Sequence, residues 1–162
     1  MASTYVPIAT TTLGSAQSSV TFSSFSGYTD LIIVINAKNT TNGSACKIQF
    51  NSDSGSNYST TWLEGNGSAA SSGRASNDTA SFIYYNGNAS TYNWSTANVH
   101  IQNYSNSTTY KTAISRFGNQ AQTGAYVDLW RSTAAITSIA LNAITENFQS
   151  GSTFTLYGIK AA

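Results

Sequence analysis

The chain is poor in charge. Only 8% of its 162 residues are Asp, Glu, Lys or Arg, whereas an average soluble domain has about 25%. Seven basic and six acidic residues give a formal net charge of +1. Nucleic-acid binders gain most of their affinity from clustered basic side chains that neutralise phosphates. No basic run occurs in this sequence, so we expect no nucleic-acid partner.

Cysteine, histidine, proline and long apolar runs are also scarce. Cys46 is the only cysteine and His100 the only histidine, which excludes an internal disulfide and a zinc site built from several such ligands. Cys46, within "ACKIQF", is predicted to be a small buried side chain. The longest apolar run, "LIIVI" at 31–35, is much shorter than the roughly 18 residues of a membrane-spanning helix. We therefore expect no membrane association.

The N-terminal sequence has no positively charged region followed by a continuous apolar stretch, so it does not resemble a secretory signal. We expect synthesis in the cytoplasm. The rest of the composition is typical of exterior-facing β-proteins: Ser, Thr and Asn make up about 64 of the 162 residues, beside ten Tyr, seven Phe and three Trp. A particle assembled inside a cell and released by lysis would reconcile these two observations.

The hydrophobic periodicity is almost entirely of two residues, which indicates β-strands. In "SVTFSS", Val20 and Phe22 share one face. The run from Asp30 to Lys38 is apolar on both faces over five residues, so it is predicted to be a central strand covered on both sides. The ten predicted strands are residues 19–24, 30–38, 45–50, 58–64, 79–86, 96–104, 110–117, 124–132, 136–144 and 153–160.

Clusters of Gly, Asn, Ser and Asp separate these segments and indicate turns. The longest connection, residues 65–78, is expected to be the most mobile loop. No linker divides the chain and no repeat is evident. We predict a single all-β domain, an antiparallel β-sandwich with jelly-roll connections over residues 18–162, preceded by a short N-terminal arm over residues 1–17. The predicted core consists of Val20, Phe22, Ile33, Ile48, Phe50, Ile101, Ile139, Leu141 and Leu156.

Residues that could carry chemistry are few. A Ser-His-Asp arrangement would require His100, which is predicted to lie on the polar face of its strand, and no G-x-S-x-G sequence is present. Asp53, Glu64, Asp78 and Asp128 have no distinctive spacing, and turn or surface roles are favoured for them. The loop "NSDSGSN" has a single carboxylate, too few for strong calcium binding. We expect no enzymatic activity, no metal and no cofactor.

The three tryptophans are the remaining candidates for a binding site, because flat aromatic rings beside amides and carboxylates are suited to sugars. The three candidates are Trp62, Trp94 and Trp130. Trp94 lies in a polar context, and Trp130 falls on the strand face opposite Val127 and Leu129, so Trp94 and Trp130 are the possible glycan contacts. Core packing and burial against a neighbouring subunit are the alternatives.

Three stretches of the sequence carry a resemblance to a known group of proteins. They are "MASTYVPIATTTLGSAQSSVTFSS", "IQFNSDSGSNYSTTWLEGNG" and "ITSIALNAITENFQSGSTFTLYGIKAA". The most specific parts are Phe50–Ser59 and Gly151–Ile159. The chain resembles small virion structural proteins of tailed bacteriophages, especially marine and cyanobacterial phages, over nearly its whole length. The resemblance implies a structural component of a virion and carries no catalytic residues.

Only about 17 residues precede the first predicted strand, too few for a fibre shaft. We therefore expect a capsid decoration (cement) protein on the particle exterior, assembled as a homotrimer on the major capsid protein or other virion proteins. The alternative is a carbohydrate-binding receptor module of a tail fibre or tail tip, with a host surface glycan as ligand. The possible subunit or capsid contacts are Tyr5, Val6 and Ile8 in the arm and Tyr157 and Ile159 in the last strand.

Overall fold

The structure is a computed structural model that describes residues 4–40, 45–85, 94–144 and 146–160. Within these ranges every regular element is a β-strand, and no helix there is long and apolar enough to cross a membrane. The strands are β1 (Tyr5–Thr12), β2 (Ser19–Ser23), β3 (Asp30–Ala37), β4 (Ala45–Phe50), β5 (Tyr58–Gly65), β6 (Ala70–Asp78), β7 (Ser81–Tyr85), β8 (Ser95–Ile101), β9 (Lys111–Gly118), β10 (Thr123–Trp130), β11 (Ser138–Ala143) and β12 (Thr153–Ile159).

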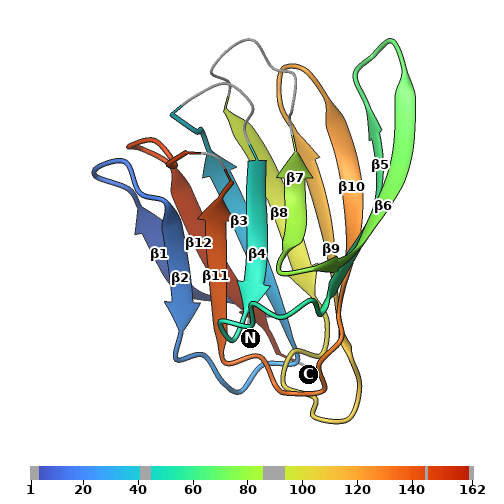
Figure 1. The fold of residues 1–162 in the computed structure, drawn as a ribbon. Helices are drawn as coiled ribbons and strands as arrows, with labels where there is room; N and C mark the ends of the chain where they lie inside the picture. The colour runs from blue at the N-terminus through green and yellow to red at the C-terminus, as the bar shows by residue number, and fades with distance from the viewer. Residues whose placement is uncertain (1–3, 41–44, 86–93, 145, 161–162) are drawn as a thin grey trace.

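Two antiparallel sheets form a sandwich, which confirms the predicted fold class. The large sheet has eight strands in the order β1-β12-β3-β8-β9-β10-β5-β6, and the small sheet has four in the order β2-β11-β4-β7. The chain alternates between the sheets from β1 to β5 and again from β10 to β12, in the manner of a jelly roll. In Figure 1 the small sheet lies in front, and β5 and β6 curve past its edge strand β7.

The core lies between the two sheets, where the alternating apolar residues of both meet. All nine residues predicted for it are buried. Burying side chains of this kind contributes about 1.5–3 kcal/mol each. The pairing of β11 with both β2 and β4 places Leu141 directly between Val20 and Ile48. Cys46 is buried as predicted, and burial raises the pKa of its thiol.

Two expectations about the chain outside the ten predicted strands are wrong. Residues 5–12, expected in an N-terminal arm, form edge strand β1, which pairs with β12 from Tyr5–Ile159 to Thr12–Thr153. Residues 70–78, expected in a mobile loop, form β6, which pairs with β5 along its length. Both are edge strands, so their backbones are held by one neighbour each while their side chains bury little apolar area.

Strand β3 lies inside the large sheet between β12 and β8, but only one of its faces is covered by the small sheet. Leu31, Ile33 and Ile35 are fully buried against the core. On the opposite face Ile32 is buried as well, but Val34 is 42% exposed. Within the described residues, the prediction of a strand covered on both sides is therefore met at Ile32 but not at Val34.

Candidate functional site

The face of the large sheet turned away from the small sheet, here called the outer face, carries unusually many exposed apolar side chains. Strand alternation and register place the outer patch there: the exposed Tyr5, Val34, Leu63, Ile114 and Val127, together with the half-buried Ile159. Tyr5 pairs directly with Ile159, and Ile114 pairs directly with Val127. The outer patch thus extends across the sheet from β1 to β5.

The predicted subunit contacts are divided between the two sides of β1 and β12. Tyr5 is exposed, and Tyr157 and Ile159 are half-buried, all on the outer face. Val6 and Ile8 are half-buried, and Ile8 packs against the core. Val6 pairs with Gly158. The ring of Tyr28 occupies the space that a side chain at position 158 would need, because a Cβ added to Gly158 would lie 2.2 Å from Cδ1 of Tyr28. Tyr5, Tyr157 and Ile159 are therefore better placed for an intermolecular contact than Val6 and Ile8.

A shallow depression of about 290 Å³ interrupts the outer patch. His100 and Arg116 line it beside Tyr5, Ile114 and Ile159. His100 is half-buried, and its Nε2 lies 3.0 Å from Oδ2 of Asp30, whose Oδ1 accepts a hydrogen bond of 2.7 Å from the backbone N–H of Asn103. The histidine is on the polar side of its strand as predicted, and it orders the rim of the depression.

Trp130 is not a glycan contact, because its side chain is buried. It does lie opposite Val127 and Leu129, but its face of β10 is the one that meets the core. Its ring stacks on Tyr58, and its indole N–H donates to Oδ2 of Asp53 over 2.7 Å. Trp94 is 45% exposed just before β8 and remains accessible to a ligand.

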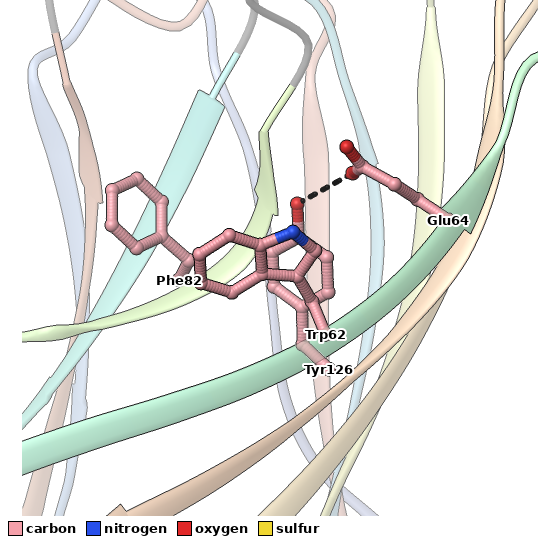
Figure 2. A pocket seen from close by; sticks show the side chains of 4 residues that line it. All are labelled: Trp62, Glu64, Phe82 and Tyr126. Carbon is pink, nitrogen blue, oxygen red and sulfur yellow. Dashed lines mark hydrogen bonds between the residues drawn. The ribbon is translucent and has the colours of Figure 1, made fainter. Parts of the chain in front are cut away.

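The residues that the structure does bring together form a pocket that the sequence did not predict as a unit. This aromatic pocket is defined by Trp62, Glu64, Phe82 and Tyr126 and has a volume of about 280 Å³. Trp62 and Glu64 share the inner side of β5, and Tyr126 pairs with Trp62 from β10. Phe82 closes the pocket from edge strand β7 of the small sheet, as Figure 2 shows. The pocket exists because β5 and β6 extend past the cover of the small sheet.

The carboxylate of Glu64 is held at the pocket by hydroxyl groups. Its Oε2 accepts a hydrogen bond of 3.0 Å from the Tyr126 hydroxyl, drawn in Figure 2. Its Oε1 accepts one of 3.3 Å from Ser71 of β6. The only salt bridge among the described residues is the one between His100 and Asp30, so the Glu64 carboxylate has no cationic partner within that part of the chain.

The Trp62 ring lies flat against the backbone of β6 at Gly73. A Cβ added to Gly73 would lie 2.4 Å from Cζ2 of the indole, so a glycine is required for this orientation. The Tyr126 ring is tilted by 45° at a centroid distance of 6.0 Å from the indole. The sequence contains one signal for this pocket: Trp62 and Glu64 are two positions apart in a predicted strand, which places both side chains on one face.

The other candidate carboxylates are used inside the protein. Asp53 accepts hydrogen bonds from Trp130, Asn57 and the N–H of Gly55, and the bond from Trp130 holds the pKa of its carboxyl below the ordinary value. Asp128 is buried, and desolvation raises its pKa to about 7. Asp78 is half-buried at the end of β6. Among the described residues no group of three or more His, Cys, Asp or Glu could hold a metal ion.

Comparisons with known proteins leave the family open. No protein-family model matches the chain, and no curated protein matches it. Among solved structures, the chain is similar to galectin LEC-6 of Caenorhabditis elegans, at 8% identity and a TM-score of 0.37, covering 94% of this chain and 96% of that one. It is also similar to the exo-inulinase of Aspergillus awamori, at 9% identity and a TM-score of 0.37, covering 96% of this chain and 29% of that one. Likenesses this weak carry no argument about function.

Proposed function

We propose that the protein is a structural component of a bacteriophage virion that decorates the outside of the capsid as a homotrimer. The observation that carries this proposal is the outer patch. Val34, Ile114 and Val127 stand exposed on the middle strands of the large sheet, where a chain that acts alone would place polar side chains. A neighbouring subunit or the shell beneath it would bury them.

The polar surroundings of the outer patch also suit a protein contact. Contact surfaces combine an apolar centre with neutral polar groups and contain few charges at the core. Asn98 and Thr96 lie on the same face beside the patch, and Arg116 is the cation at its depression. With 8% charged residues in the whole chain, little electrostatic repulsion opposes the approach of a second copy.

Tyr5, Tyr157 and Ile159 are the contacts that we assign to the subunit or capsid interface. They come from two adjacent strands, and Tyr5 and Ile159 line the depression together with His100 and Ile114. The partner of this surface is the major capsid protein or another copy of the chain. The sequence resemblance to small phage virion proteins supports the same assignment.

The second candidate function is receptor binding through a glycan, as a domain of a tail fibre or tail tip. The aromatic pocket favours it, because a half-buried indole beside a carboxylate offers both stacking and hydrogen bonds. Neither function requires a metal or a cofactor. We propose no enzymatic activity for either, since Asp53 and Asp128 are occupied by structural contacts.

Electron microscopy of the particle that carries the protein tests the proposal. A capsid decoration protein is expected as many copies distributed over the shell, with the outer patch buried against shell or neighbour. Copies confined to one vertex would instead support the tail function. Absence of the chain from purified particles would overturn both.

A further inference from the structure

We propose that the aromatic pocket binds one neutral pyranose residue of a glycan, with the apolar face of the sugar on Trp62 and its hydroxyl groups bonded to Glu64 and to the Trp62 indole N–H. The inference does not depend on the protein being part of a virion. It rests on the shape, the hydrogen-bonding groups and the charge of the pocket.

The shape of the pocket presents an indole ring as a flat platform. The Trp62 ring packs against Gly73 and against the core, and the part of the ring that stays half-exposed lines the pocket. Phe82 and Tyr126 stand beside it as walls. The volume of about 280 Å³ is at the small end for ligand sites, which suits a single sugar ring better than a larger molecule.

The pocket offers both an acceptor and a donor to hydroxyl groups. The Glu64 oxygens already accept from Tyr126 and Ser71, and a carboxylate has about four lone-pair positions, so each oxygen can accept once more. The indole N–H of Trp62 donates to no protein group in the part of the chain that the structure describes. A sugar hydroxyl acts as donor and acceptor together and can therefore satisfy both.

The charges around the pocket favour a neutral ligand over an ion. The Glu64 carboxylate would repel an anion. The Nζ of Lys47 lies 4.3 Å from the centroid of the Phe82 ring, so the cation–π capacity of that ring is already taken and a second cation would meet the ammonium group. A molecule without charge avoids both penalties.

The test is a titration of the protein, followed in NMR through the indole N–H signals and, for variants that lack Trp62, through the backbone amide signals of β5 and β10, with the methyl glycosides of glucose, galactose, mannose and N-acetylglucosamine. We expect at least one glycoside to shift the Trp62 signal with a millimolar dissociation constant. Trp62→Ala should weaken binding at least about tenfold, equivalent to ~1.4 kcal/mol. Glu64→Gln should weaken it severalfold, because the amide keeps the shape of the side chain but is a poorer acceptor.

Two further variants make the result specific. Gly73→Ala should also weaken binding, since the added methyl group displaces the indole, and it provides a second test if Trp62→Ala does not fold. Trp94→Ala removes an exposed tryptophan outside the pocket and should leave binding unchanged. The proposal is overturned if no glycoside binds, if Trp94→Ala abolishes binding in place of Trp62→Ala, or if tetramethylammonium binds in the pocket more tightly than every glycoside. The titration uses the isolated protein, and electron microscopy of particles tests the proposed function. A protein that binds no glycoside can therefore be told apart from a protein that is absent from particles.

Discussion

Asp128 shows at the scale of a single residue how the sandwich controls a charge. Its side chain is buried on β10, opposite Thr60 of β5, whose hydroxyl donates to Oδ1 over 2.8 Å. Desolvation dominates and raises the pKa of Asp128 from 3.8 to about 7, while the hydroxyl groups of Thr60 and Ser81 act in the opposite direction. The carboxyl is therefore accommodated best in its neutral form.

Replacing Asp128 with Asn should remove a pH dependence of stability. Since the folded pKa is above the unfolded one, the stabilising contribution is complete below the ordinary value of 3.8 and is lost as the pH rises to about 7. The loss amounts to about 1.4 kcal/mol per pH unit within that window. Asn keeps the shape and can still accept from Thr60. We expect the variant to be more stable than the wild type by roughly 2 to 4 kcal/mol at about pH 8.

Denaturant unfolding of both proteins across this pH range measures the effect. The difference between the two curves isolates Asp128, because the opposite contribution of Asp53, whose lowered pKa costs stability only in acid, is present in both. Parallel curves for wild type and variant would contradict the expected titration of Asp128.

Some contacts of single residues could not be predicted, because the residues that make them are far apart in the sequence. The turn around Asp53 was evident from its Gly, Ser and Asn neighbours, and the structure confirms a hydrogen-bonded loop. Its bond to Trp130 joins residues 77 positions apart. Alternation showed that Trp130 and Val127 lie on opposite faces, but only the placement of the small sheet decides which face is covered.

At the scale of elements, the strands that sequence analysis identified are those with one buried apolar face. Strand β6, "ASSGRASND", has no such face, because it lies beyond the cover of the small sheet and all of its side chains are exposed or half-buried. Strand β1 contains Pro7, which is tolerated at a sheet edge, and a register shift between Pro7 and Ala9. A two-residue alternation of apolar side chains marks strands that bury one face. Strands that are held mainly by backbone hydrogen bonds to a neighbour lack this alternation and were therefore missed.

Deleting residues 1–12 should therefore destabilise the domain. The deletion removes the strand that pairs with β12 on that side, and with it the packing of Ile8 against the core. An uncovered strand edge is a template for pairing with other chains. We expect a lower thermal midpoint and concentration-dependent aggregation, measured by thermal unfolding and light scattering.

Deletion of residues 1–3 alone is the matched control, since strand β1 begins at Tyr5, and it should behave like the full chain. If the longer deletion were equally stable and monodisperse, the N-terminal segment would be an accessory arm, as first expected from the sequence. In that case its role in holding a neighbour could be tested directly by the loss of particle binding.

The whole molecule is asymmetric, and this asymmetry accounts for both candidate surfaces. Eight strands face four, so the small sheet does not cover the whole inner side of β5: Tyr58 and Thr60 are buried, whereas Trp62 and Glu64 are only half-buried where the aromatic pocket opens. On the outer face of the large sheet, the described residues leave Val34, Ile114 and Val127 exposed. The apolar run of β3 could be identified from the sequence as favouring burial on both faces, but alternation alone could not show that Ile32 would be buried and Val34 exposed.

Self-association through the outer face is the prediction at this scale. Val127 is 50% exposed on β10 and pairs with Ile114 in the middle of the outer patch. Val127→Glu would place an unpaired carboxylate in a contact that excludes water, and burying such a charge costs several kcal/mol. We expect the wild-type protein to sediment as a trimer in analytical ultracentrifugation and the variant to shift to monomer, with an unchanged far-ultraviolet circular dichroism spectrum.

Thr21→Glu is the control for charge alone, because Thr21 is exposed on β2, between the inward-facing Val20 and Phe22, and therefore lies on the outside of the small sheet. It adds the same charge on the opposite side of the sandwich and should leave the trimer intact. A wild-type chain that stays monomeric at all concentrations would contradict the trimer, and dissociation by Thr21→Glu but not by Val127→Glu would move the contact to the small sheet. Retention of the trimer in both variants would place the contact away from the centre of the outer patch, and the exposure of Val34, Ile114 and Val127 would then need a partner other than this chain.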